Sequence, residues 1–158
     1  MFKCAIVGCG NIAGSYGDNS LKDVVLTHAS AYQQCKDTML IAASDIDINK
    51  LKLFGKRWNI NKLYLDYRDM IDNEDIDILS ICTPTEKHYE VFKYACGKNI
   101  SAIFCEKPLS CNLKEAEEMV KMAKNKIVAI NYFRRWNPTI ENLRKELNIG
   151  SYGKIKTI

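Results

Sequence analysis

The first residues whose spacing indicates chemistry are glycines that interrupt an apolar run near the N-terminus. Residues 4–7 are apolar, Gly8 ends the run, and the pattern Gly8-x-Gly10-x-x-Ala13 follows. Gly8 permits a tight turn, Gly10 lets an anion approach the backbone, and the small Ala13 lets a helix pack closely on a strand. Because free N–H groups at the start of a helix bind anions, the pattern predicts a cradle for the pyrophosphate of a dinucleotide.

An acidic residue at the end of the second apolar run supplies the next group that a dinucleotide needs. Asp45 follows residues 39–44, and a carboxylate there accepts hydrogen bonds from the adenosine ribose and repels a 2′-phosphate. No basic residue adjoins it, since Ile46 follows, so we expect NAD in preference to NADP. The usual separation from the glycines is about 20 residues, and an inserted polar stretch over residues 15–26 accounts for the longer spacing here. The alternative is that Asp45 caps the next helix.

A lysine directly after another apolar run has the type and position for proton transfer. Glu106-Lys107-Pro108 follows residues 101–105. Removal of a hydride from carbon is coupled to loss of a proton from the attached oxygen, and a lysine can take that proton or stabilise the developing alkoxide. Glu106 can orient Lys107 or bind the nicotinamide-side ribose, and Pro108 favours a cis or sharply turned peptide. A solvated surface pair is the alternative interpretation of Glu106 and Lys107.

The rest of the chain predicts the elements that position these residues. Short apolar runs alternate with helical patterns of roughly ten residues, which indicates parallel strands with helices on both faces. We therefore expect an α/β fold, a Rossmann-type doubly wound parallel sheet in a single three-layer domain. Ligands bind beyond the carboxyl ends of such strands. The groups expected at that edge are Gly8, Gly10, Asp45, Thr83-Pro84-Thr85, Glu106-Lys107-Pro108 and Arg135.

Two histidines have open roles at this stage. His88 lies one turn into the helix after Thr83-Pro84-Thr85, where it either holds that loop or faces the mouth of the site. A lone helical histidine is more often structural, and His28 is interpreted in the same way.

Composition excludes several other classes of protein. The 158 residues are 47% hydrophobic and 27% charged, as in ordinary globular domains, and the net charge of +4 is dispersed, so no nucleic-acid partner is expected. No apolar run reaches the roughly 20 residues of a membrane helix, and no secretion signal is recognised. Seven scattered cysteines without a Cys-x-x-Cys pair favour buried free thiols, a reducing cytoplasm and no metal site. Redox sensing by Cys9 in the glycine turn is the remaining alternative for a thiol.

The motifs together identify a family resemblance. They are Gly8-Cys9-Gly10-Asn11-Ile12-Ala13, Asp45, Thr83-Pro84-Thr85-x-x-His88, Glu106-Lys107-Pro108-Leu109 and Arg135-Trp136-Asn137-Pro138. This combination resembles the Gfo/Idh/MocA oxidoreductases, the group of glucose–fructose oxidoreductase and inositol dehydrogenase. The resemblance implies hydride transfer between NAD and a hydroxyl of a sugar, cyclitol or nucleotide sugar, with Lys107 as the catalytic residue. It also implies cofactor contacts by Gly8, Gly10, Asn11, Ile12, Asp45, Thr83, Pro84, His88, Glu106, Lys107 and Arg135.

The resemblance also bears on domain organisation. Members of that family are longer and carry a second α+β domain that supplies most substrate contacts and the oligomer interface. We therefore expect residues 1–150 to form the dinucleotide-binding domain and residues 151–158 to begin a second domain, with a homo-oligomer as the full-length form. The chain alone would bind cofactor with little or no turnover. The alternative is a stand-alone nucleotide-sensing or protein-interaction module, whose apolar end at Ile155 and Ile158 would contact a partner.

Overall fold

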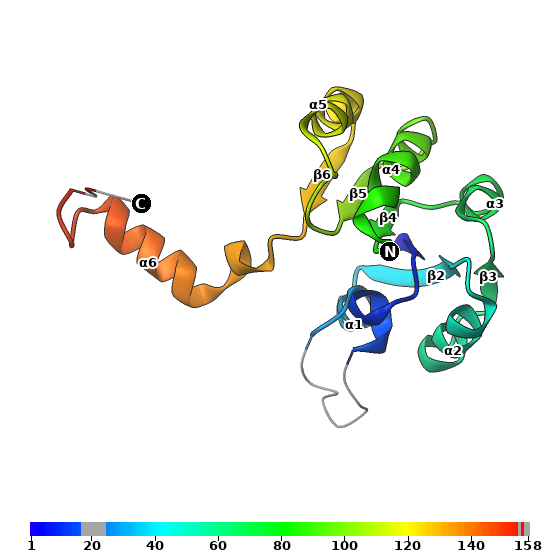
Figure 1. Ribbon diagram of the computed structural model, residues 1–158. Coiled ribbons are helices and arrows are strands. Elements are labelled where there is room, and N and C mark those ends of the chain that lie inside the picture. The colour runs from blue at the N-terminus through cyan, green and yellow to red at the C-terminus, as the bar shows by residue number, and fades with distance from the viewer. Residues whose placement is uncertain (17–24, 155, 157–158) are drawn as a thin grey trace.

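The computed structural model describes residues 1–16, 25–154 and 156, and its centre is a parallel sheet (Figure 1). All pairings in the sheet are parallel, and the strand order is β3-β2-β1-β4-β5-β6. The order reverses between β1 and β4, and ligands bind at such a switch point in doubly wound sheets. The predicted fold class is thus confirmed. The strands are β1 (Phe2–Val7), β2 (Thr38–Ser44), β3 (Lys62–Tyr64), β4 (Ile78–Ile81), β5 (Ala102–Cys105) and β6 (Ile127–Ile130).

Helices follow the strands, and most begin at a polar cap. Thr27 and Ser30 form a reciprocal capping box at the start of α1, and side chains of Asp47, Asp66 and Asn112 accept backbone N–H groups at three other helix starts. The helices and turns are η1 (Asn11–Ser15), α1 (His28–Gln34), α2 (Ile48–Trp58), α3 (Tyr67–Asn73), η3 (Thr85–Lys87), α4 (His88–Cys96), α5 (Leu113–Met122), η4 (Ala123–Asn125), η5 (Phe133–Trp136) and α6 (Pro138–Asn148).

Both faces of the central strand are buried. Along β1, Ala5 and Val7 join one apolar cluster, while Cys4 and Ile6 join another. The first cluster takes side chains from α3, α4 and α5, and the second takes them from α1 and α2. This double burial explains why the strand is a continuous apolar run instead of an alternating one.

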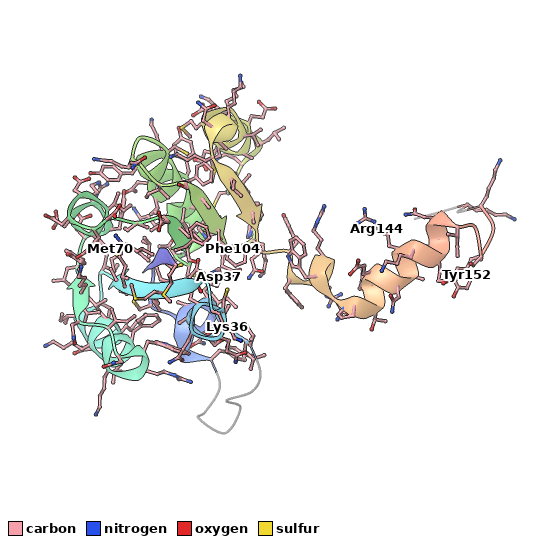
Figure 2. All side chains as sticks on the ribbon, turned by 180° about the vertical axis from the view of Figure 1, so that it is seen from behind. Lys36, Asp37, Met70, Phe104, Arg144 and Tyr152 are labelled. Carbon is pink, nitrogen blue, oxygen red and sulfur yellow. The ribbon has the colours of Figure 1, made fainter. Side chains whose placement is uncertain are left out.

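The last helix lies apart from the sheet. Figure 1 shows α6 projecting beyond β6, and Figure 2 shows Arg144 and Tyr152 far from Met70 and Phe104 in the packed body. No residue of α6 is buried, and Ile140 and Leu143 are about half exposed. We refer to residues 133–154 as the arm.

Two predictions concern residues that are wholly or partly outside the described part of the chain. The inserted stretch at residues 15–26 falls largely on residues 17–24, which are not described. Ile155 and Ile158, on which the alternative of an interaction module depends, also lie outside the described residues. The described residues 151–154 form a turn and irregular backbone.

Candidate active site

A cavity of about 440 Å³ lies at the carboxyl ends of β1, β2, β3 and β4. Four residues predicted for the site line it, namely Gly8, Asp45, Thr83 and Pro84. Its remaining wall comes from the residues after β3 and from the start of α4, and includes Ile46, Leu65, Tyr67, Arg68 and Glu90. The strand ends therefore meet at one cavity, as the parallel topology predicts.

The glycine turn at this edge is fixed by close packing. Gly8 has φ +90°, and a Cβ atom there would lie 2.7 Å from the carbonyl oxygen of Cys82. A side chain at Gly10 would meet nothing within 4 Å, so space for an anion lies beside its backbone. Ala13 is fully buried as predicted, and a Cβ at Gly14 would in addition collide with the rings of Phe54 and Trp58 on α2.

Asp45 joins the glycine turn to the start of α2. Its Oδ2 accepts the backbone N–H of Cys9 at 2.7 Å, and its Oδ1 accepts the backbone N–H of Asp47 at 2.8 Å. The capping alternative for Asp45 is wrong, because the side chain of Asp47 accepts the N–H groups of Asn49 and Lys50 at the helix start. A carboxylate has about four acceptor positions, so Asp45 retains capacity for ribose hydroxyl groups.

Two hydroxyl groups on the cavity wall have no protein partner. Ser44 Oγ and Thr83 Oγ1 are buried and make no hydrogen bond among the described residues. Both residues line the cavity. Unpaired buried hydroxyls are uncommon in folded proteins, so these two fit a site that receives polar ligand atoms.

His88 connects two strand-end loops. The ring is 1% exposed, with Nδ1 2.8 Å from the carbonyl oxygen of Pro108 and Nε2 2.9 Å from that of Thr83. The buried ring therefore lies between the loop after β4 and the turn after β5 and donates to the carbonyl of at least one of them, which agrees with the holding role that the sequence left open. The Lys107–Pro108 peptide bond is cis, one of the two conformations expected at Pro108.

Glu106 is buried and held by three hydrogen bonds. Its Oε1 lies 3.0 Å from His28 Nε2 and accepts the Asn131 amide at 2.5 Å, and its Oε2 accepts the backbone N–H of Lys107 at 3.2 Å. Burial by itself raises the pKa of Glu106, but the hydrogen bonds of His28 and Asn131 outweigh it and lower that pKa. The interpretation of Glu106 and Lys107 as a solvated pair is wrong for Glu106.

The two cationic residues predicted for the site differ in their surroundings. Lys107 is exposed, and its ammonium group makes no hydrogen bond or ion pair within the described residues. Arg135 lies on η5 at the base of the arm, with its guanidinium 6.0 Å from the centre of the Trp136 ring. Its described contacts do not join it to the cavity. Asn11 and Ile12 are exposed on η1, directly after the glycine turn.

Sequence reasoning missed part of the site. It interpreted His28 as structural and did not consider Ser80 or Asn131, although all three belong to the network behind Glu106. No motif marks them, because His28 and Glu106 are 78 positions apart and meet only in the folded chain. The presence of a second histidine outside the recognised motifs was the one available signal.

The thiols do not supply a further reactive group. Burial raises the pKa of Cys9 to about 12, which keeps the thiol protonated and opposes a redox role in the glycine turn. All seven cysteines are free. Among the described residues no group of His, Cys, Asp and Glu side chains is arranged to hold a metal ion. Nor does that part of the chain contain a helix with the length and apolarity to cross a membrane.

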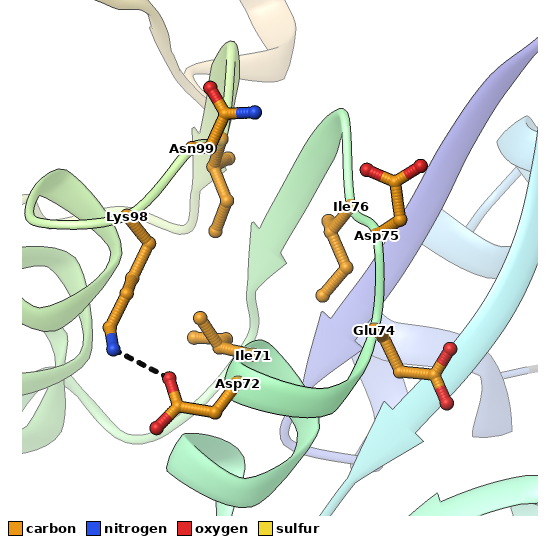
Figure 3. Close-up of a pocket in the computed structure, with 8 residues that line it drawn as sticks. Ile71, Asp72, Glu74, Asp75, Ile76, Lys98 and Asn99 are labelled. Carbon is orange, nitrogen blue, oxygen red and sulfur yellow. Dashed lines mark ion pairs between the residues drawn. The ribbon is translucent and has the colours of Figure 1, made fainter.

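A second cavity, of about 290 Å³, lies at the amino-terminal ends of β4 and β5, away from the carboxyl ends of the strands (Figure 3). It is lined by Asp72, Glu74 and Asp75 before β4 and by Lys98 before β5. Each carboxylate already has a lysine partner at 2.6 Å, namely Lys98, Lys62 and Lys3 respectively. These pairs account for the acidic side chains, so this cavity is not part of the candidate site.

Comparison with known proteins identifies the family. Residues 2–132 match the model of the Gfo/Idh/MocA oxidoreductases, described as an oxidoreductase family with an NAD-binding Rossmann fold. This chain belongs to that family. It is 30% identical over 129 residues to myo-inositol 2-dehydrogenase of Thermotoga maritima. The aligned residues are 80% of this chain and 38% of that protein. It is 27% identical over 154 residues to D-apiose dehydrogenase of Paraburkholderia graminis. Those residues are 96% of this chain and 38% of that protein.

Solved structures agree with this assignment. The crystal structure of myo-inositol 2-dehydrogenase from Lactobacillus plantarum superposes with a TM-score of 0.83 at 31% identity, over 98% of this chain and 43% of that one. A Chromobacterium violaceum dehydrogenase solved with NADH and UDP-GlcNAcA superposes with a TM-score of 0.84 at 26% identity. The match covers 98% of this chain and 41% of that one. The chain thus spans about two fifths of the length of these relatives and corresponds to their NAD-binding Rossmann domain.

Proposed function

We propose that this chain is the cofactor-binding part of an oxidoreductase that transfers a hydride between NAD and a hydroxyl group of a sugar, cyclitol or nucleotide sugar. The observation that carries the proposal is the cavity at the strand ends, where Asp45 is hydrogen-bonded to the glycine turn. Glu106 and Lys107 follow β5 at the same carboxyl edge of the parallel sheet. Relatives named as inositol and apiose dehydrogenases support the substrate class.

The site residues divide along the length of a dinucleotide. Asp45 would bind the adenosine ribose, and the N–H groups around Gly10, Asn11 and Ile12 would meet the pyrophosphate. Towards the nicotinamide end, contacts would come from Thr83, Pro84, His88 and Glu106, while Arg135 would reach the cofactor from the arm. The two unpaired hydroxyls of the cavity wall and the open space beside Gly10 fit such a ligand.

Lys107 is the proposed catalytic residue. When bound, NAD supplies the hydride acceptor or donor. Lys107 would take the proton from the substrate hydroxyl as the neutral amine, becoming an ammonium group, and would return that proton in the reverse direction. Its side chain is exposed and makes no hydrogen bond or ion pair within the described residues, so it can turn towards a substrate. Glu106 supports this role because it holds the backbone N–H of Lys107.

We also propose that residues 1–150 form the cofactor domain and that residues 151–158 begin a second α+β domain, which contributes substrate contacts and the interface of a homo-oligomer. The half-exposed apolar side chains of Ile140 and Leu143 on α6 support this proposal. So do the relatives, which extend well beyond the matched region. The free cysteines fit a cytoplasmic protein.

Titration of the chain with NADH tests the cofactor assignment. We expect saturable enhancement of the NADH fluorescence, and weaker binding of NADPH because the Asp45 carboxylate repels a 2′-phosphate. Absence of NADH binding up to millimolar concentration would overturn the proposal, and a preference for NADPH would overturn the role of Asp45.

A further inference from the structure

A hydrogen-bonded network lies directly behind Glu106. His28 of α1 is 3% exposed and stands between Glu106 at the end of β5 and Ser80 of β4, with Nδ1 2.8 Å from Ser80 Oγ. The Ser80 oxygen lies 2.6 Å from the hydroxyl of Tyr32, which is also on α1. The His28 ring packs against Phe104, with ring centres 4.5 Å apart. The ring is therefore held on both its edges and on one face.

The partners of His28 determine which of its nitrogens carries the proton. The Glu106 carboxylate only accepts hydrogen bonds, so Nε2 must donate to it. In the neutral ring Nδ1 then accepts the Ser80 hydroxyl proton, and the Ser80 oxygen accepts the Tyr32 proton. Every donor in this order has an acceptor. If instead Nδ1 donated to Ser80 and Ser80 donated to Tyr32, the Tyr32 hydroxyl proton would have no acceptor among the described residues.

The same network leaves Glu106 one acceptor position. Oε1 is occupied by His28 and Asn131, and Oε2 accepts the N–H of Lys107. A carboxylate offers about four acceptor positions, so one on Oε2 stays open within the described part of the chain. Because His28 and Asn131 both bind Oε1, they fix which oxygen remains available.

We propose that His28 is a positioning residue, which holds Glu106 so that the open position of Oε2 receives a ribose hydroxyl on the nicotinamide side of the cofactor. The inference rests on the proposed function, since it requires that NAD binds at this edge. It assigns to α1 a part in cofactor binding that the glycine turn and the strand-end motifs do not include.

Two ligands of different length test the proposal. NADH reaches both ends of the site, whereas AMP occupies only the adenosine end at Asp45. We expect His28→Leu to weaken NADH binding by about tenfold, the loss of one hydrogen bond that involves a charged group, and to leave AMP binding unchanged. His28→Gln offers an amide donor to Glu106 and should recover most of the NADH affinity. Tyr32→Phe is the matched control, because it alters the far end of the network without touching Glu106.

The outcomes separate this proposal from the one on which it rests. If the unsubstituted chain binds neither NADH nor AMP, the proposed function fails. If it binds both, and His28→Leu weakens both equally or neither, His28 has only a structural role. Should His28→Leu not fold, NMR of the unsubstituted chain decides. We expect a proton on Nε2 and a shift of the Glu106 carboxyl carbon signal on addition of NADH but not AMP, and an unmoved signal overturns the inference.

Discussion

Replacing Asp45 by alanine separates the two tasks of its carboxylate. The substitution removes the acceptors of the Cys9 and Asp47 N–H groups, at 2.7 and 2.8 Å. Since Cys9 is 1% exposed, its N–H would stay unsatisfied. Loss of both bonds is expected to lower the free energy of unfolding by about 2–4 kcal/mol, and the melting temperature by roughly 4–16 °C for a domain of this size. Loss of the ribose contacts should weaken NADH binding by about 10- to 150-fold.

Asp66→Ala is the matched control for this experiment. Asp66 also follows a strand, lines the same cavity and accepts a backbone N–H, that of Arg68 at 2.8 Å, but it does not touch the glycine turn. We expect Asp66→Ala to lower the free energy of unfolding by about 1 kcal/mol through the lost helix cap, and to leave NADH affinity nearly unchanged. Thermal melts and fluorescence titrations of both variants supply the comparison. Wild-type affinity in Asp45→Ala, or equal losses in the two variants, would refute the reasoning.

Three further results are expected. Gly8→Ala should lower the free energy of unfolding by about 1–3 kcal/mol in urea melts, because φ is +90° and the new Cβ would lie 2.7 Å from a backbone oxygen; unchanged stability would contradict this. The folded-state pKa of Glu106 is lowered, so its contribution to stability is present above the ordinary value of 4.5 and is lost as the pH falls through the folded value; Glu106→Gln should therefore flatten the acid side of the stability profile, and an unaltered slope would count against it. A maleimide should label the exposed Cys35 and Cys111 in the native chain and Cys9 only after denaturation, as mass spectrometry can check.

Much of the fold was predictable because local signals agree with the tertiary arrangement. The ends of α2, for example, are set by neighbouring residues, since Asp47 caps its start and Asn59 follows it in a left-handed conformation. The apolar pattern at residues 76–82 extends beyond the strand β4, Ile78–Ile81, and the Asp77 side chain accepts the backbone N–H of Lys3. The direction of α6 was not predictable, because an amphipathic pattern shows which face is apolar but not what lies against it.

The site was predictable only where its residues follow the strands. Gly8, Asp45 and Glu106 were recognised because parallel topology sends the carboxyl ends of the strands to one edge. His28 and Asn131 were not recognised, since their shared partner is 78 and 25 positions away in the chain. Their contribution depends on side-chain geometry, which spacing in the sequence does not encode.

Glu106 and Lys107 are adjacent in the chain but have opposite surroundings, because one side chain is buried and the other is exposed. Successive side chains at the end of a strand point to opposite sides. Here Glu106 is buried with three hydrogen bonds, while the exposed Lys107 side chain has no polar partner in the part of the chain that the structure describes. A carboxylate held in this way would present a fixed hydrogen-bond acceptor to a bound cofactor. An exposed lysine side chain can turn towards a substrate and would accept a proton as the neutral amine or donate one as the ammonium group. If Lys107 transfers the proton and Glu106 binds the cofactor ribose, as proposed, their adjacency at one strand end would set the distance along the backbone between these two groups. The network through His28 would then keep the carboxylate in place.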